Sequence, residues 1–138
     1  MNYNFDVKVG NHISPQVLNG AQSPTGSVDF LDYNACQFVL DVTSSSTPAT
    51  TNYAVYTSPD NNVWTILAGS TLTFSASSNG LAVWNIDKFG NTYQRYLCLS
   101  GSQASGTSSV CAISILSMGK GTISASGGGA SLGIFPTP

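Results

Sequence analysis

The sequence predicts an all-β fold, an antiparallel β-sandwich of jelly-roll type with extended N- and C-terminal arms. Composition is the first observation. Charged residues make up 7% of the 138 residues and all six acids are aspartate, so the strong helix formers Glu, Lys and Arg are scarce. The second observation is a series of short segments in which apolar and polar residues alternate with period two. These segments recur about every 10 to 15 residues, and no convincing segment has the helical period. A small β-barrel is the alternative fold.

The first 27 residues are predicted to form an extended arm with at most one or two strands. Phe5, Val7 and Val9 alternate with polar residues, but glycine, proline and asparagine then interrupt the pattern. We therefore place the start of the β-sandwich domain at residue 28 and its end at residue 117.

The segment 28–43 contains the clearest strand of this domain. Cys36, Phe38, Leu40 and Val42 alternate with more polar residues, which indicates a strand with one buried face. A polar loop follows this strand.

Residues 52–67 are predicted to form a β-hairpin with a return strand at 63–67. The two apolar runs flank Ser-Pro-Asp-Asn-Asn, a sequence typical of a turn. We expect the hairpin tip to turn the chain rather than to recognise a ligand.

Four further strands complete the predicted sandwich. They lie at 70–76, 81–86, 92–101 and 108–116. The last two are expected to pair with each other as an antiparallel hairpin, because a short polar segment joins them.

Residues 118–138 are predicted to form a flexible Gly/Ser-rich arm with an apolar hook at Leu132, Ile134 and Phe135. Such a hook gains buried area only after a partner binds. A tail without a partner is the alternative.

The residue types needed for catalysis are poorly represented. His12 is the only histidine and lies in the interrupted N-terminal segment, and the sequence contains no GxSxG motif. Asp32, Asp60 and Asp87 lie at expected turns, where an aspartate side chain commonly bonds to the backbone. We therefore predict no enzyme, no cofactor and no metal site.

The three cysteines also argue against a metal site. Cys36, Cys98 and Cys111 form an odd set without a CxxC spacing, and each lies in an apolar strand pattern. We expect buried free thiols rather than a disulfide or a metal site.

Charge and hydropathy also limit the partners. The formal net charge is −2 with four basic residues, so direct nucleic-acid binding is not expected. No apolar run approaches the ~20 residues of a membrane helix, and the N-terminus does not have the pattern of a signal peptide. We expect synthesis in the cytoplasm and no membrane partner.

The aromatic residues leave one choice open. Trp64 and Trp84 both lie in apolar strands, so we expect both indoles to pack in or over the core. The alternative is an exposed indole that stacks on a sugar or anchors a partner. The strand faces of Tyr53 and Tyr56 are not decided by the sequence.

Four stretches together resemble a known pattern: "VDFLDYNACQFVLDV", "VYTSPDNNVWTIL", "YQRYLCLSG" and "VCAISIL". Their order and chemistry are similar to those of small β-sandwich virion proteins of tailed bacteriophages. The resemblance covers residues 28–117 through loose motifs. Galactose-binding-like jelly rolls of the discoidin type have a related rhythm, but Cys98 lies where those domains commonly carry a second arginine.

The resemblance implies a virion structural protein, and we expect a capsid decoration or cement protein on the capsid surface. Its partner would be the major capsid protein, and it would form a homo-oligomer such as a trimer. Alternatives are a carbohydrate-binding or adhesion module and a head–tail connector or tail structural protein. The expected contact residues lie in the two arms: Tyr3, Phe5, Leu132, Ile134 and Phe135.

Overall fold

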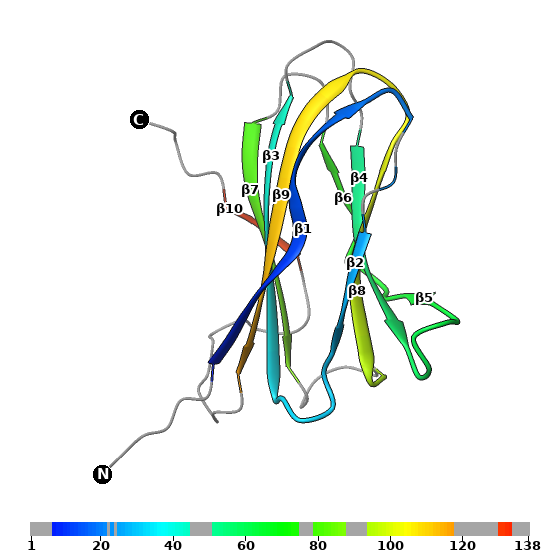
Figure 1. The fold of residues 1–138 in the computed structure, drawn as a ribbon, viewed down its shortest axis with the longest axis vertical. Coiled ribbons are helices and arrows are strands. Elements are labelled where there is room, and N and C mark those ends of the chain that lie inside the picture. The colour runs from blue at the N-terminus through cyan, green and yellow to red at the C-terminus, as the bar shows by residue number, and fades with distance from the viewer. Residues whose placement is uncertain are drawn as a thin grey trace.

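The computed structural model describes residues 7–21, 23, 25–44, 51–74, 79–87, 94–117 and 130–133, with backbone alone at 44, 79 and 130–133. The described residues form ten strands and no helix, arranged as two antiparallel sheets that face each other (Figure 1). The strands are β1 (Val7–Asn19), β2 (Thr25–Asp29), β3 (Ala35–Ser44), β4 (Thr51–Ser58), β5 (Thr65–Ile66), β6 (Leu72–Phe74), β7 (Asn79–Asp87), β8 (Tyr96–Gln103), β9 (Thr107–Ser117) and β10 (Ala130–Gly133).

The strand order is that of a jelly roll. Sheet A has the order β1-β9-β3-β7-β10, and sheet B has the order β2-β8-β4-β5 with β6 also paired to β4. The pairs are nested in the sequence: β4 with β5 and β6, then β3 with β7, then β2 with β8, and finally β1 with β9. Successive pairs lie in alternate sheets, as in a long hairpin rolled onto itself. The predicted β-sandwich is confirmed.

The core lies between the two sheets and follows the predicted alternation. In β3, Phe38, Leu40 and Val42 are at most 1% exposed, whereas the residues between them point away from sheet B. Trp84 of β7 and Tyr53 of β4 are also inside. Burial of these side chains is the main source of stability, at ~25 cal/mol per Å² of apolar surface.

The N-terminal boundary predicted at residue 28 is wrong. Residues 7–19 form β1, which pairs with β9 along its length, so the sandwich begins at Val7. The register shifts twice, between Asn11 and Ile13 and between Ile13 and Gln16. Each irregularity breaks the period-two pattern, and Pro15 lies inside the second, where a strand tolerates proline. For this reason the sequence showed only the alternation at Val7 and Val9 and not a strand of this length.

The expected hairpin between residues 92–101 and 108–116 is also wrong. β8 lies in sheet B and β9 in sheet A, so the short connection between them crosses from one sheet to the other. Gly106 makes the crossing possible, because its φ of 84° is unfavourable for residues with a side chain.

Part of the predicted C-terminal arm belongs to the sandwich. Ala130–Gly133 form β10, which pairs antiparallel with β7 at the edge of sheet A, with Leu132 opposite Ala82. The open edge of β7 supplies backbone partners to this short segment, whose composition does not favour a strand.

Two polar side chains connect the sheets through the core. The buried His12 of β1 accepts the backbone N–H of Leu99 in β8 through Nε2 at 3.0 Å, and its ring lies 4.7 Å from that of Phe38. The Trp84 indole N–H donates to the carbonyl oxygen of Ser70 at 2.7 Å. Because buried polar groups are costly when unpaired, these bonds favour one relative position of the sheets.

The buried state of His12 predicts a pH-dependent stability. Burial lowers the pKa of His12 from 6.5 to about 4, so below pH 6.5 the unfolded chain takes up a proton that the folded chain resists. The free energy of unfolding is therefore unaffected by the titration of His12 above pH 6.5 and decreases as the pH falls towards 4. Since one pKa unit corresponds to about 1.4 kcal/mol, the full effect is roughly 3 kcal/mol. Urea unfolding at pH 7 and pH 4.5 measures it.

The control for this measurement is the variant His12→Gln, which keeps an acceptor for the Leu99 N–H but does not titrate. Its free energy of unfolding should fall less between the two pH values than that of the wild type. Equal losses in both proteins would contradict the assignment to His12.

Tyr53 gives a second prediction, because its buried hydroxyl has no hydrogen-bond partner among the described residues. The ring packs edge-on against Phe74 at 5.9 Å, and a side chain at Gly101 would collide with it. The variant Tyr53→Phe keeps the packing and removes the unpaired hydroxyl. Its free energy of unfolding should therefore lie between the wild-type value and a value about 1 kcal/mol higher. A loss above ~1 kcal/mol in urea unfolding would show that the hydroxyl has a partner.

Candidate functional site

The outer face of sheet A carries exposed apolar side chains where a solvated sheet normally carries polar ones. Val9 and Val17 of β1 are 62% and 63% exposed, and Ile113 of β9 is 40% exposed. Ile113 lies opposite Val39 in β3, which in turn lies opposite Val83 in β7. We call this surface the sheet-A face; it comprises Val7, Val9, Val17, Val39, Val83, Ile113 and Ile115.

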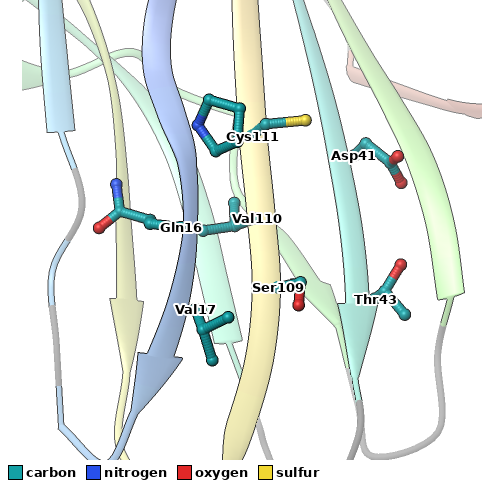
Figure 2. Close-up of a pocket in the computed structure, with 8 residues that line it drawn as sticks. Gln16, Val17, Asp41, Thr43, Ser109, Val110 and Cys111 are labelled. Carbon is teal, nitrogen blue, oxygen red and sulfur yellow. The ribbon is translucent and has the colours of Figure 1, made fainter.

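A hollow of about 340 Å³ lies at one end of this face. Figure 2 shows its lining side chains on three neighbouring strands, β1, β9 and β3. Val17 and Cys111 supply apolar surface, and Asp41, Thr43 and Ser109 supply oxygen atoms. The hollow adjoins the second irregularity of β1, near Pro15. It gives this end of the face a concave shape, which can contribute to shape complementarity with a protein partner.

The predicted contact residues can be placed in part. Leu132 lies in β10, at the edge of sheet A opposite to β1. Tyr3, Phe5, Ile134 and Phe135 lie outside the described residues. Since Val7 opens β1 and Gly133 closes β10, both predicted arms join the sandwich at sheet A.

The hairpin loop between β4 and β5 is built by Asp60, as its expected turn position suggests. One carboxylate oxygen, Oδ1, accepts the backbone N–H groups of Asn62 and Val63 and the hydroxyl of Ser58, each at 3.0 Å. The bonds from Val63 and Asn62 hold the pKa of Asp60 below its usual value. Asn61 adopts a left-handed backbone with a φ of 61°, which asparagine tolerates better than most residues.

This loop forms one wall of a groove of about 480 Å³ on the outer face of sheet B. We call it the sheet-B groove; its main lining residues are Thr25, Ser27, Tyr56, Asn61, Trp64 and Ser100. The buried Cys98 also lines it, and its Sγ lies 2.9 Å from the Thr25 hydroxyl.

The structure shows where the tryptophans lie and which way Tyr53 and Tyr56 point. Trp84 is in the core as expected, but Trp64 is half-buried at the groove, outside the core cluster, so the prediction that both indoles pack in or over the core is wrong for Trp64. Tyr53 points inward and Tyr56 outward. The hairpin tip therefore both turns the chain and lines a surface hollow, which the sequence-based expectation did not include.

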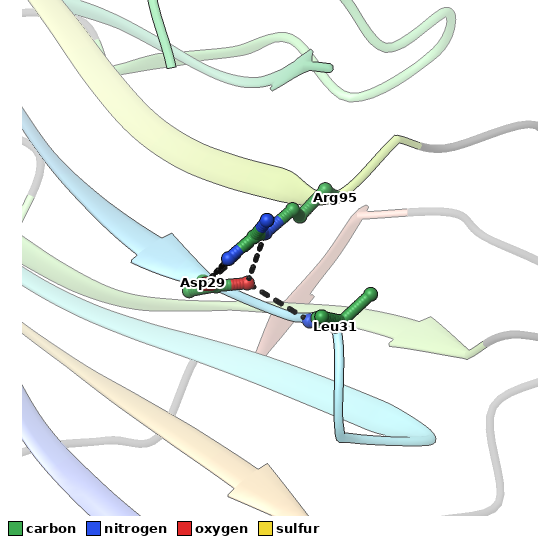
Figure 3. Close-up of polar contacts among 3 residues, drawn as sticks. All are labelled: Asp29, Leu31 and Arg95. Atoms are coloured by element: carbon green, nitrogen blue, oxygen red, sulfur yellow. Dashed lines mark hydrogen bonds and ion pairs between the residues drawn. The ribbon is translucent and has the colours of Figure 1, made fainter. Parts of the chain in front are cut away.

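The Arg-Tyr element of the sequence resemblance has a structural role. Arg95 donates from Nη2 to Oδ2 of Asp29 at 2.7 Å and from Nε to both carboxylate oxygens at 3.2 Å. Asp29 also accepts the Leu31 N–H at 3.1 Å (Figure 3). This pairing lowers the pKa of Asp29. The guanidinium also lies 5.0 Å from the centre of the Tyr96 ring. The contacts join the end of β2 to the start of β8.

Other chemistry is limited in the described part of the chain. Cys36, Cys98 and Cys111 are free thiols; the first two are buried as predicted, whereas Cys111 is half-buried at the sheet-A hollow. Among the described residues, no three His, Cys, Asp or Glu side chains gather as metal ligands. The same residues include no apolar helix of membrane-spanning length.

Comparisons with known proteins show similarity to solved structures, including the two that follow. No protein-family model and no curated protein matches the chain. The SPBc2 prophage-derived protein YomS is similar at 13% identity and a TM-score of 0.49, over 85% of this chain and 97% of that one. A family two carbohydrate esterase from Cellvibrio japonicus is similar at 9% identity and a TM-score of 0.35, over 96% of this chain and 36% of that one. Both similarities are too distant to bear on function.

The different positions of the two indoles predict their fluorescence. In the variant Trp64→Phe the remaining emission comes from the buried Trp84, so it should lie at shorter wavelength than in the wild type and be quenched several-fold less by iodide. Stern–Volmer titrations of the two proteins measure this. Equal quenching in both would show that Trp64 is not accessible at the groove.

Proposed function

We propose that this chain is a structural protein of a phage virion, specifically a head decoration or cement protein that docks its sheet-A face on the major capsid protein lattice. The observation that carries the proposal is the exposed apolar side chains on β1 and β9, since such a surface is stabilised when a protein partner covers it. The resemblance of residues 28–117 to small virion proteins of tailed phages supports the choice of partner.

The dimensions of sheet A supply most, but not all, of the area that such a contact needs. Five strands about 4.8 Å apart, with ~10 residues in the longer ones, give a footprint of roughly 20 by 30 Å, or about 600 Å². A stable interface needs about 800 Å² from each partner. The face alone therefore falls somewhat short, and the two arms would supply the remainder.

The positions of the two arms support a contact that is shared between the sheet-A face and the arms. At least six residues precede β1 and five follow β10, at opposite edges of sheet A. At ~3.5 Å per extended residue, these segments can reach about 20 Å beyond the edges, enough to contact an adjacent subunit. Tyr3, Phe5, Ile134 and Phe135 would provide the apolar contacts there.

Repetition would strengthen a modest contact. A capsid presents the same surface many times, and a homo-oligomer such as a trimer would occupy several copies at once, so the apparent affinity would exceed that of one contact. The chain would then be found on the virion surface.

A matched pair of variants tests the proposal. Val9 on the sheet-A face and Val63 in the β4–β5 loop are both 62% exposed, so lysine has a similar effect on solubility at either position. We expect Val9→Lys to weaken binding to assembled capsids of the encoding phage by at least about tenfold, because a lysine charge would be buried in the contact. Val63→Lys should bind like the wild type. Co-sedimentation with capsids that lack the protein measures both.

Three outcomes would contradict the proposal. The wild type could fail to bind capsids, both variants could bind equally well, or Val9→Lys could dissociate an oligomer in analytical ultracentrifugation without changing capsid binding. The last result would identify the sheet-A face as a contact between copies of the chain. Binding to isolated tails instead of capsids would favour a connector or tail role.

A further inference from the structure

The sheet-B groove lies on the opposite side of the sandwich from the sheet-A face. Its walls come from β2, β8 and β4 and from the loop that carries Asn61 and Trp64. Its volume of about 480 Å³ falls within the ~300–1,000 Å³ range of small-molecule pockets. A partner bound through sheet A would leave this groove open to solvent.

The lining combines aromatic surface with neutral polar groups. Tyr56 and Trp64 are both half-buried, so each keeps part of its ring accessible. The side chains of Ser27, Asn61 and Ser100 form no hydrogen bond with another described residue and are available to a ligand. None of the described residues that line the groove is charged. An anionic or cationic ligand would therefore find no complementary charge here.

A second hollow continues the groove along the face of sheet B. It has a volume of about 260 Å³ and shares Tyr56 and Ser100 with the first. Asn52, Thr71 and Ser102 add further amide and hydroxyl groups there. Tyr56 thus lies between two adjoining hollows, an arrangement that suits a ligand of at least two linked rings.

The wall formed by the loop is held in place before any ligand binds. Three hydrogen bonds to the carboxylate of Asp60 fix the loop on both sides of Asn61, and Asn61 itself is held in the left-handed conformation. A preformed wall reduces the entropy that a ligand must overcome on binding.

We propose that the sheet-B groove binds a neutral saccharide of at least two sugar units. The apolar face of a pyranose ring stacks on aromatic side chains, and its closely spaced hydroxyls match the serine, threonine and asparagine groups of the lining. A peptide fits less well. The groove lies on the face of a sheet, where the backbone groups of β8 and β4 are already paired with neighbouring strands, so a peptide backbone would find few partners.

The test uses the free protein, so its outcome does not depend on capsid binding. A glycan array of neutral hexose and N-acetylhexosamine oligosaccharides identifies a binding sugar, and isothermal titration calorimetry measures its affinity. We expect a Kd between about 10 µM and 1 mM for a single site. In NMR titrations of the wild type, the Trp64 indole N–H should shift on binding, whereas that of the buried Trp84 should not.

Variants locate the site. We expect Trp64→Ala and Tyr56→Ala each to weaken binding by at least about tenfold in calorimetry. Val63→Lys, next to Trp64 but outside the lining, and Val9→Lys, on the opposite sheet, should both bind like the wild type. Thermal unfolding of each variant confirms that it is folded.

Four results would overturn the inference. They are the absence of binding to every neutral oligosaccharide on the array, binding that survives both aromatic substitutions, NMR shifts confined to residues outside the groove, and tighter binding of a proline-rich peptide that displaces the sugar. The last would assign the groove to a peptide.

Discussion

The packing of two antiparallel sheets against each other is the constraint on which the rest of this molecule depends. Nested pairing joins segments that are far apart in the sequence, so no pair except β4 with β5 and β6 is local. Each strand buries one face only when the opposite sheet covers it. The bonds from His12 to Leu99 and from Trp84 to Ser70 cross this core and favour one alignment of the sheets.

The same packing divides the outer surface into two faces of different chemistry. Because each strand commits alternate residues to the core, the remaining residues cover the outside of each sheet. On sheet A these include the seven valines and isoleucines of the sheet-A face beside polar residues such as Gln37 and Asn85, and on sheet B they are serine and threonine beside Tyr56 and Trp64. The two proposals assign protein contact to the first face and saccharide binding to the second. A protein with so few charges has little electrostatic means of recognition, so shape, apolar area and hydroxyl groups would supply it.

Local bonding makes the outer surfaces specific. Asp60 fixes the loop that brings Asn61 and Trp64 to the sheet-B groove, and Asp29 with Arg95 fixes the end of β2 against β8. Asp60 therefore serves the site through the loop it supports, with no need to touch a ligand itself. On sheet A, the irregularities of β1 place Pro15 and Val17 beside Cys111 and create the hollow.

The sequence by itself determined the fold class, most of the strands and the role of Asp60 as a turn residue. Period-two alternation is a local property, and in β3 it correctly identified Cys36, Phe38, Leu40 and Val42 as the inward face. Only the tertiary structure decided which strands share a sheet, where β1 and β10 belong, and which indole is buried. Trp64 and Trp84 both lie among apolar residues in the sequence, but Trp84 is buried in the core and Trp64 lies on the surface of sheet B. The physical reason is that alternation distinguishes two faces of a strand, whereas the opposite sheet decides which of them is covered.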